Sequence, residues 1–285
     1  MMLLLKISIV GFIAGSLFQM GLELSLRSAV SGLRNLRFVL YTVGFGFVAG
    51  PLLAVVLAYG LGLDRPYALG LMILGLTPSA PFLPLVISRA RLDPGYVPAV
   101  LLVSAFLTIL VLPVAIPLLV GSADIGFMAI ARPLGLMILP PLVIGMAIYR
   151  VAPELAAAIR GKAKPVVAFF TIATLVLCVL IYGRAFYDAA GSFAFLSQIL
   201  LLGGIAVATH MFATGLDRDQ KSTLVLAMST RNAGAALAPL YSIAGIDERA
   251  IVMVVLSVPS QLLVAMSIAW MISRSLATGR EESGV

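Results

Sequence analysis

Residues Ser229 to Asn232 place hydroxyls, a guanidinium and an amide in the middle of an apolar stretch, residues 222–240, that is long enough to cross a lipid bilayer. Arg231 lies ten residues after Lys221, which marks one edge of the stretch. At ~1.5 Å per residue the depth is ~15 Å, half of a hydrocarbon core of roughly 30 Å. An arginine at that depth costs roughly 2.5–3.5 kcal/mol on insertion scales, so its presence indicates a function.

The backbone around this polar run is not expected to form an unbroken helix, because Gly234 and Pro239 follow it. Irregular backbone inside a membrane is tolerated only within protein or beside a cavity. A buried guanidinium needs a partner, and a carboxylate or another oxyanion matches its planar fork. Two roles remain open for Arg231: contact with an anion, or a structural clamp on carbonyls freed at the break. The sequence therefore predicts a broken transmembrane helix that carries a midplane binding site.

Composition places this site in a polytopic membrane protein. The 285 residues are 61% hydrophobic and 11% charged, with a mean hydropathy of +1.13, whereas a soluble domain would have about a quarter of its residues charged. The net charge of +7 is therefore interpreted through the positive-inside rule and not as a nucleic-acid surface. The one cysteine, Cys178, excludes an internal disulfide and a cysteine-based metal cluster. No motif typical of an enzyme is present.

Nine hydrophobic spans are predicted, at about 3–24, 37–61, 66–88, 97–120, 127–149, 164–187, 195–214, 221–242 and 250–273. Thirteen basic residues fall on one side of them: Arg27, Arg34, Arg37, Arg89, Arg91, Arg150, Arg160, Lys162, Lys164, Arg218, Lys221, Arg274 and Arg280. Four fall on the other: Lys6, Arg65, Arg184 and Arg249. This bias predicts a cell-membrane protein with its C-terminus in the cytoplasm and its N-terminus outside.

The third span is also expected to be broken. Pro78, Pro81 and Pro84 each remove a backbone donor, and an unbroken helix does not accommodate them at this spacing. The flanking arginines lie twelve residues to either side of Thr77, about 18 Å by helical rise, so the break falls near the midplane. Taken alone, the pattern is equally compatible with a simple proline kink.

An internal repeat relates the two broken spans. The sequence Gly-Leu-Asp-Arg at 62–65 recurs at 215–218, and the same offset of 153 aligns two polar pairs at the breaks, Thr77 with Thr230 and Ser79 with Asn232. Because five spans separate the copies, they enter the membrane from opposite sides. Corresponding broken helices in two inverted halves are the sequence signature of a secondary transporter's binding site.

Other polar groups could join this site. Ser260 and Gln261 in the last span fall near the midplane. His210 could bridge two helices or relay protons, and Glu23 could be an interfacial acid facing Arg27 or a proton site. The predicted substrate site comprises eight side chains: Thr77, Ser79, Ser229, Thr230, Arg231, Asn232, Ser260 and Gln261. It contains no carboxylate to balance a bound cation, so no metal site is expected.

These residues resemble the bile acid:sodium symporter family over nearly the whole chain. The resemblance rests on the two broken spans and on three motifs: Met20-Gly-Leu-Glu-Leu, Thr230-Arg231-Asn232-Ala-Gly-Ala-Ala-Leu, and Trp270 after Ser260-Gln261. It implies one all-α transport unit over 1–285, with a core at about 37–120 and 195–273 and a panel at about 3–24 and 127–187. It also implies that organic anions move by an elevator or rocking motion coupled to two sodium ions.

Departures from the family motifs change the expected coupling. The family has Glu where Ala227 stands and Gln where Arg231 stands, and its third-span motif Cys-Pro-Gly-Gly is replaced here by residues 77–80, Thr-Pro-Ser-Ala. Asn232 matches the family pattern. The expected chain is therefore a divergent member whose sodium sites are lost and which needs no cofactor.

The function predicted from these features is alternating-access transport of a small organic anion, sodium-independent or linked to protons. Two alternatives remain open: a sodium-coupled symporter with relocated ion ligands, and a membrane receptor or scaffold that has lost transport. The expected partners are the anionic substrate and the lipid bilayer, and the oligomeric state stays open.

Overall fold

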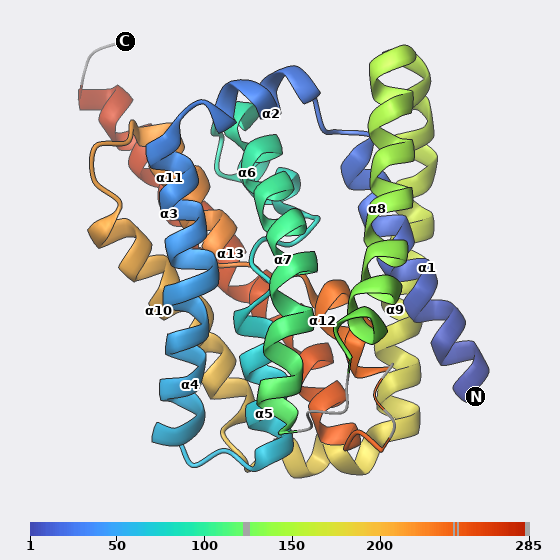
Figure 1. The fold of residues 1–285 in the computed structure, drawn as a ribbon. Coiled ribbons are helices and arrows are strands. Elements are labelled where there is room, and N and C mark those ends of the chain that lie inside the picture. The colour runs from blue at the N-terminus through green and yellow to red at the C-terminus, as the bar shows by residue number, and fades with distance from the viewer. Residues whose placement is uncertain (122–125, 242, 244, 283–285) are drawn as a thin grey trace.

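The computed structural model describes residues 1–121, 126–241, 243 and 245–282 (Figure 1). Within these residues all regular elements are helical, and one isolated bridge joins two extended segments. The side chain of Arg280 lies outside the described part. The prediction of an all-α, multi-pass membrane protein is confirmed.

Seven helical stretches of the described chain are long and apolar enough to cross a membrane. They are α1 (Met2–Gly21), the run α3 (Leu36–Val43), η1 (Gly44–Ala49) and α4 (Gly50–Gly60), the run η2 (Pro94–Tyr96) and α7 (Val97–Val120), α8 (Phe127–Val151), α9 (Pro153–Ala189), α10 (Ala194–Phe212) and α13 (Glu248–Glu282). Within the second stretch η1 is a single π-helical turn. Helix α2 (Leu26–Leu33) lies across the upper end of the molecule (Figure 1).

Two further segments are interrupted. The first consists of α5 (Arg65–Gly75) and α6 (Leu83–Arg89), and the second of α11 (Arg218–Met228) and α12 (Ala233–Leu240). Both interruptions lie inside the bundle (Figure 1). The predicted breaks at the third and eighth spans are therefore present in the structure. The count of nine crossings stays a prediction, because the short halves are not by themselves spanning helices.

The repeated Gly-Leu-Asp-Arg sequence forms the same start in both broken segments. Gly62 and Gly215 have φ of 62° and 68°, a left-handed conformation that glycine adopts without steric cost. Two residues later Asp64 and Asp217 occupy the N-cap positions of α5 and α11, and Asp217 completes a capping box with Gln220.

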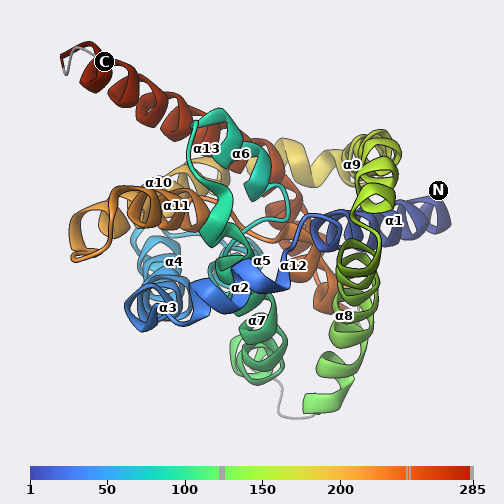
Figure 2. The same cartoon turned by 90° about the horizontal axis from the view of Figure 1, so that it is seen from above.

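Helices α1, α8 and α9 lie together at one side of the molecule, and the remaining helices gather on the other side (Figures 1 and 2). Small residues allow the close approach of α1 and α8: a Cβ built on Gly145 would lie 2.5 Å from the Phe18 carbonyl oxygen and 2.9 Å from the Cα of Gly21. Such contacts between glycines are the usual way for membrane helices to pack tightly.

Candidate functional site

The site is built where the two interrupted segments meet. The extended residues between their halves form an antiparallel bridge between Pro78 and Arg231. The Ser79 N–H donates to the Thr230 carbonyl at 3.0 Å, and the Asn232 N–H donates to the Thr77 carbonyl at 2.8 Å. The two bonds are equivalent in the internal repeat, because the offset of 153 aligns Thr77 with Thr230 and Ser79 with Asn232. Each break thus provides hydrogen-bond partners for backbone N–H and C=O groups of the other break.

Three hydroxyls of the predicted site bond to the ends of the broken helices. Thr77, Ser229 and Thr230 each donate to the carbonyl three residues earlier, at 3.1, 2.8 and 3.0 Å. The Thr230 hydroxyl also accepts from the Ala80 N–H at 3.0 Å, across the crossing. All three residues are fully buried. Their hydroxyls therefore cap helix ends and hold the crossing together.

Ser79 sits at the turn of the first break with φ of 66°, a left-handed conformation that is rare for a residue with a side chain and costs of order 1–3 kcal/mol. Its hydroxyl lies 3.5 Å from the Ala227 carbonyl oxygen and accepts a hydrogen bond from Ser104 at 3.3 Å. Ser104 comes from α7, so this contact ties a third element to the crossing.

Arg231 is 1% exposed, and its guanidinium points into the helix bundle. Nη1 donates to the Gly75 carbonyl at 3.3 Å, where α5 ends. A Cβ on Gly50 would lie 3.0 Å from Nη2, so the missing side chain at Gly50 makes room for the guanidinium where η1 meets α4. Within the described residues, Nε and Nη2 have no hydrogen-bond partner. The cation therefore lies at the C-terminus of α5, a helix end that carries partial negative charge.

The amides of the site lie on the other side of this cation. The Asn232 side chain caps α12 by accepting from the Ala235 N–H at 3.0 Å. Gln261 of α13 accepts from the backbone N–H of Arg231 at 2.7 Å. Ser260 instead donates to Gln198 of α10 at 2.7 Å, a buried partner that the sequence analysis missed because a single glutamine in an apolar run carries no pattern.

A cavity of about 320 Å³, the inner cavity, lies between α1 and α9 on one side and the two breaks with α13 on the other. Arg231, Asn232 and Gln261 are the predicted site residues that line it. Gly50, which lies against the guanidinium, and Gly75, whose carbonyl accepts from it, are not in its lining. The remaining polar lining comes from Ser16, Gln19 and Thr171, which were not predicted.

A larger cleft of about 790 Å³, the vestibule, lies between α6 and the beginning of α9. It shares Gln19, Pro81, Phe82 and Leu85 with the inner cavity, so the two spaces adjoin. Glu23 lines the vestibule, and burial raises the pKa of its carboxyl against the lowering effect of the basic residues on α9. The other predicted proton group, His210, is exposed on α10 and lines neither space.

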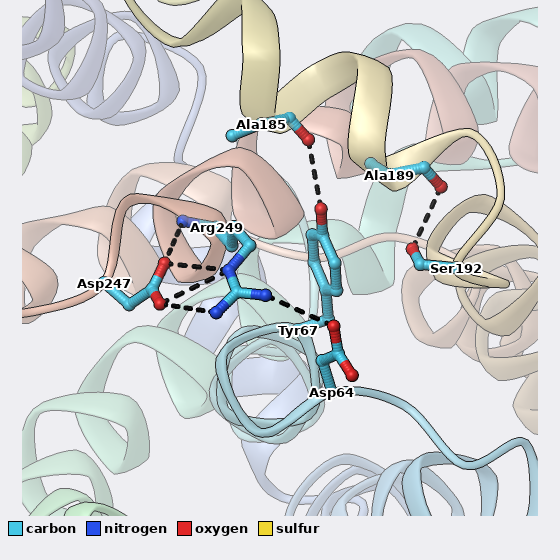
Figure 3. Close-up of polar contacts among 7 residues, drawn as sticks. All are labelled: Asp64, Tyr67, Ala185, Ala189, Ser192, Asp247 and Arg249. Atoms are coloured by element: carbon cyan, nitrogen blue, oxygen red, sulfur yellow. Dashed lines mark hydrogen bonds and ion pairs between the residues drawn. The ribbon is translucent and has the colours of Figure 1, made fainter.

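At the end of the molecule opposite α2, a polar cluster joins α5, α9 and α13 (Figure 3). Arg249 donates to Asp247 at 2.8 Å and to Asp64 at 3.2 Å. Tyr67 lies beside this guanidinium and donates to the Ala185 carbonyl of α9 at 3.0 Å. The hydroxyl of Tyr67 therefore links the broken segment to α9 at this end of the molecule, where a separate cleft of about 800 Å³ lies beside Arg65 and Asp247.

The fold and the site define a helical membrane transporter with a polar crossing inside the bundle. The profile of the sodium bile acid symporter family matches residues 12–186, more than half of the chain. The chain belongs to this family, whose members are transporters and not enzymes. A comparison with curated proteins gave no match.

Proposed function

We propose that this chain carries a small organic anion without sodium, and that the guanidinium of Arg231 occupies the place of a coupling cation. The observation that carries the proposal is the position of that guanidinium: it is buried, it donates to the Gly75 carbonyl at the end of α5, and it has no carboxylate partner among the described residues. Carbonyl oxygens at the end of a helix form a cage that suits a cation.

A sodium ion at the same carbonyl oxygens would be repelled by the guanidinium of Arg231, which is covalently fixed there. Two unit charges 4 Å apart repel by about 4 kcal/mol at an effective dielectric constant of 20. That repulsion would weaken sodium binding by roughly three orders of magnitude. Ala227 in place of the family's glutamate removes the negative charge that could offset it. Both departures from the family motif favour loss of sodium coupling.

The inner cavity supports an anion with an apolar body. Its lining is mostly apolar, with Arg231, Asn232 and Gln261 from the crossing and α13 as polar contacts beside Ser16, Gln19 and Thr171, and its volume lies at the small end of ligand pockets. It faces the beginning of α12, where the helix dipole favours negative charge. The substrate proposed is therefore a small organic anion, with its polar end at the crossing.

Alternating access is proposed to move α1, α8 and α9, the panel, against the other helices, the core. The inner cavity and the vestibule both lie between these two groups, and Tyr67 links the groups at the opposite end. The two backbone hydrogen bonds between the breaks join residues that correspond in the 153-residue repeat, and this symmetry supports two inverted halves and nine crossings. The basic residues at the α2 end support a cytoplasmic vestibule, with the N-terminus outside the cell membrane.

Uptake of radiolabelled carboxylates into proteoliposomes tests the coupling. The wild type should transport equally in sodium and potassium buffers. The double variant A227E/R231Q restores the family residues and should acquire sodium dependence, while the single variant R231Q serves as its matched control. Uptake by the wild type that requires an inward sodium gradient would reject the proposal.

A sodium symporter with relocated ligands is the second candidate, because four oxygens gather at the crossing. They are the hydroxyls of Ser79, Ser104 and Thr230 and the carbonyl of Ala227. Sodium-driven uptake by the wild type that is lost in S104A would favour this candidate.

A further inference from the structure

One face of α1 leads from the inner cavity to the vestibule. Phe12, Ser16, Gln19 and Glu23 follow one another at intervals of four, three and four residues, the spacing of a single helix face. The first three line the inner cavity, and the last two line the vestibule. Glu23 lies two residues beyond the end of α1 and is half-buried. Glu23 and Gln19 therefore both face a ligand in the vestibule, and Gln19 also faces the inner cavity.

Two cations face the same space. Arg160 and Lys164 lie one turn apart on α9, are exposed, and line the vestibule with Glu23. The vestibule has no other titratable side chain in its described lining: α6 contributes Ser88, and the chain from Leu92 to α7 contributes only apolar residues. No ion pair within 4 Å joins Glu23 to either cation in the part of the chain described. The three charges therefore interact across an open space that a ligand can occupy.

We propose that Arg160 and Lys164 form an anion-binding site in the vestibule, and that Glu23 controls it by taking up one proton for each anion bound. The ionised carboxylate offsets one of the two positive charges and repels an anion. The protonated carboxyl leaves both cations to the ligand's head group. The ligand class is a monoanion with a carboxylate or sulfonate head and an apolar body. The inference rests on the proposed function and adds proton linkage to it.

The protonation equilibrium gives this site a measurable pH dependence. Burial raises the pKa of Glu23 above its ordinary value, against the lowering effect of Arg160 and Lys164, so this carboxyl keeps its proton to higher pH than an exposed glutamate does. Above that pKa, the fraction of protein that is competent to bind falls tenfold for each pH unit. Anion affinity should fall by the same factor, and it should level off below the pKa.

Calorimetric titration of the detergent-solubilised protein with 2-naphthalenesulfonate tests this linkage, because the charge of the probe is constant between roughly pH 5 and pH 8. The wild type should bind more tightly as the pH falls. E23Q should bind tightly at every pH. The matched control is E154Q, which changes an exposed carboxylate in the first turn of α9 outside the vestibule and should keep the wild-type profile.

A pair of lysine variants tests where the anion binds. K164Q should lower the affinity about fivefold, the usual contribution of one nearby cation. K162Q removes an exposed charge that does not line the vestibule and should leave the affinity unchanged. Equal effects of the two variants would overturn the assignment.

The remaining outcomes separate this inference from the proposed function. An E23Q protein that keeps the wild-type pH profile, or a wild type that binds equally at every pH, overturns the proton linkage and leaves anion transport standing. A wild type that shows neither binding nor uptake of any tested anion overturns both.

Discussion

Replacing Arg231 by methionine distinguishes a fixed cation from a structural clamp. The change removes one charge-assisted hydrogen bond to Gly75, which contributes about 1.5–3 kcal/mol. It also removes the insertion cost of a buried guanidinium, roughly 2.5–3.5 kcal/mol, which is poorly offset here because Nε and Nη2 lack partners among the described residues. Methionine fills a similar volume with a flexible side chain. The two terms nearly cancel, so the free energy of unfolding of R231M should lie within about 2 kcal/mol of the wild type.

Equilibrium unfolding by dodecyl sulfate in mixed micelles measures this difference. Trp270 is the only tryptophan of the chain, so its fluorescence reports the transition without a label. R231A is the matched control, since it removes the same charge but leaves a cavity, and it should be less stable than R231M by about 2 kcal/mol or more. A loss above about 3 kcal/mol in R231M would refute the reasoning, because breaking a buried polar clamp has an effect of that size.

Sodium provides a second measurement on the same variant. In R231M the carbonyl of Gly75 no longer faces a cation, so sodium can approach it. Sodium, compared with equal potassium, should raise the melting temperature of R231M and leave the wild type unchanged. Equal stabilisation of both proteins would indicate that sodium binds at another site. It would argue against the guanidinium of Arg231 as a replacement for a bound cation.

Three other features give separate predictions. G145A should lower the free energy of unfolding by about 1–3 kcal/mol, because the new Cβ meets a backbone carbonyl of α1; the control G135A on the same helix has nothing within 4 Å of the new atom. Y67F removes one hydrogen bond to α9, worth about 0.5–1.5 kcal/mol, and should speed hydrogen exchange in the last turn of α9, while Y59F, an exposed tyrosine, should not. The guanidinium beside Asp247 lowers the pKa of that carboxyl, so its contribution to stability is complete above the unfolded pKa near ~3.9 and is lost as the pH falls through the folded value. The difference in melting temperature between wild type and D247N should therefore shrink on acidification. A difference that grows as the pH falls would contradict this pH dependence. The ion pair of Asp247 with Arg249 is exposed, so the effect on the melting temperature is small.

The positions of the breaks could be predicted from the sequence, because proline and glycine act locally on the backbone. Pro78, Pro81 and Pro84 cannot all lie within one helix, and the structure interrupts the chain between α5 and α6. The repeated Gly-Leu-Asp-Arg sequence was equally informative, since its glycine is left-handed and its aspartate holds the N-cap position in both copies, although only the Asp217 side chain makes the capping hydrogen bond.

The direction of a side chain at a break could not be predicted. The depth of Arg231 follows from counting residues, but its guanidinium turns toward Gly50 and Gly75 because of backbone geometry that no periodic pattern encodes. The hydroxyls of Thr77, Ser229 and Thr230 posed the same difficulty, since serine and threonine bond to nearby carbonyls as readily as to ligands. Glycines facing each other on α4 and α5 were the one signal that could have indicated where the guanidinium lies.

The bridge between Pro78 and Arg231 also has a consequence for biosynthesis. The backbone groups exposed at the first break are satisfied by residues that the ribosome adds about 150 positions later, as the bond from Ala80 to Thr230 illustrates. At roughly 5–20 residues per second, the interval is roughly 8–30 s. Unpaired backbone groups in lipid cost several kcal/mol each. During this interval the unpaired backbone groups of the first break must therefore contact water or another protein. We expect the membrane insertion machinery to provide these contacts until the second half of the chain is inserted.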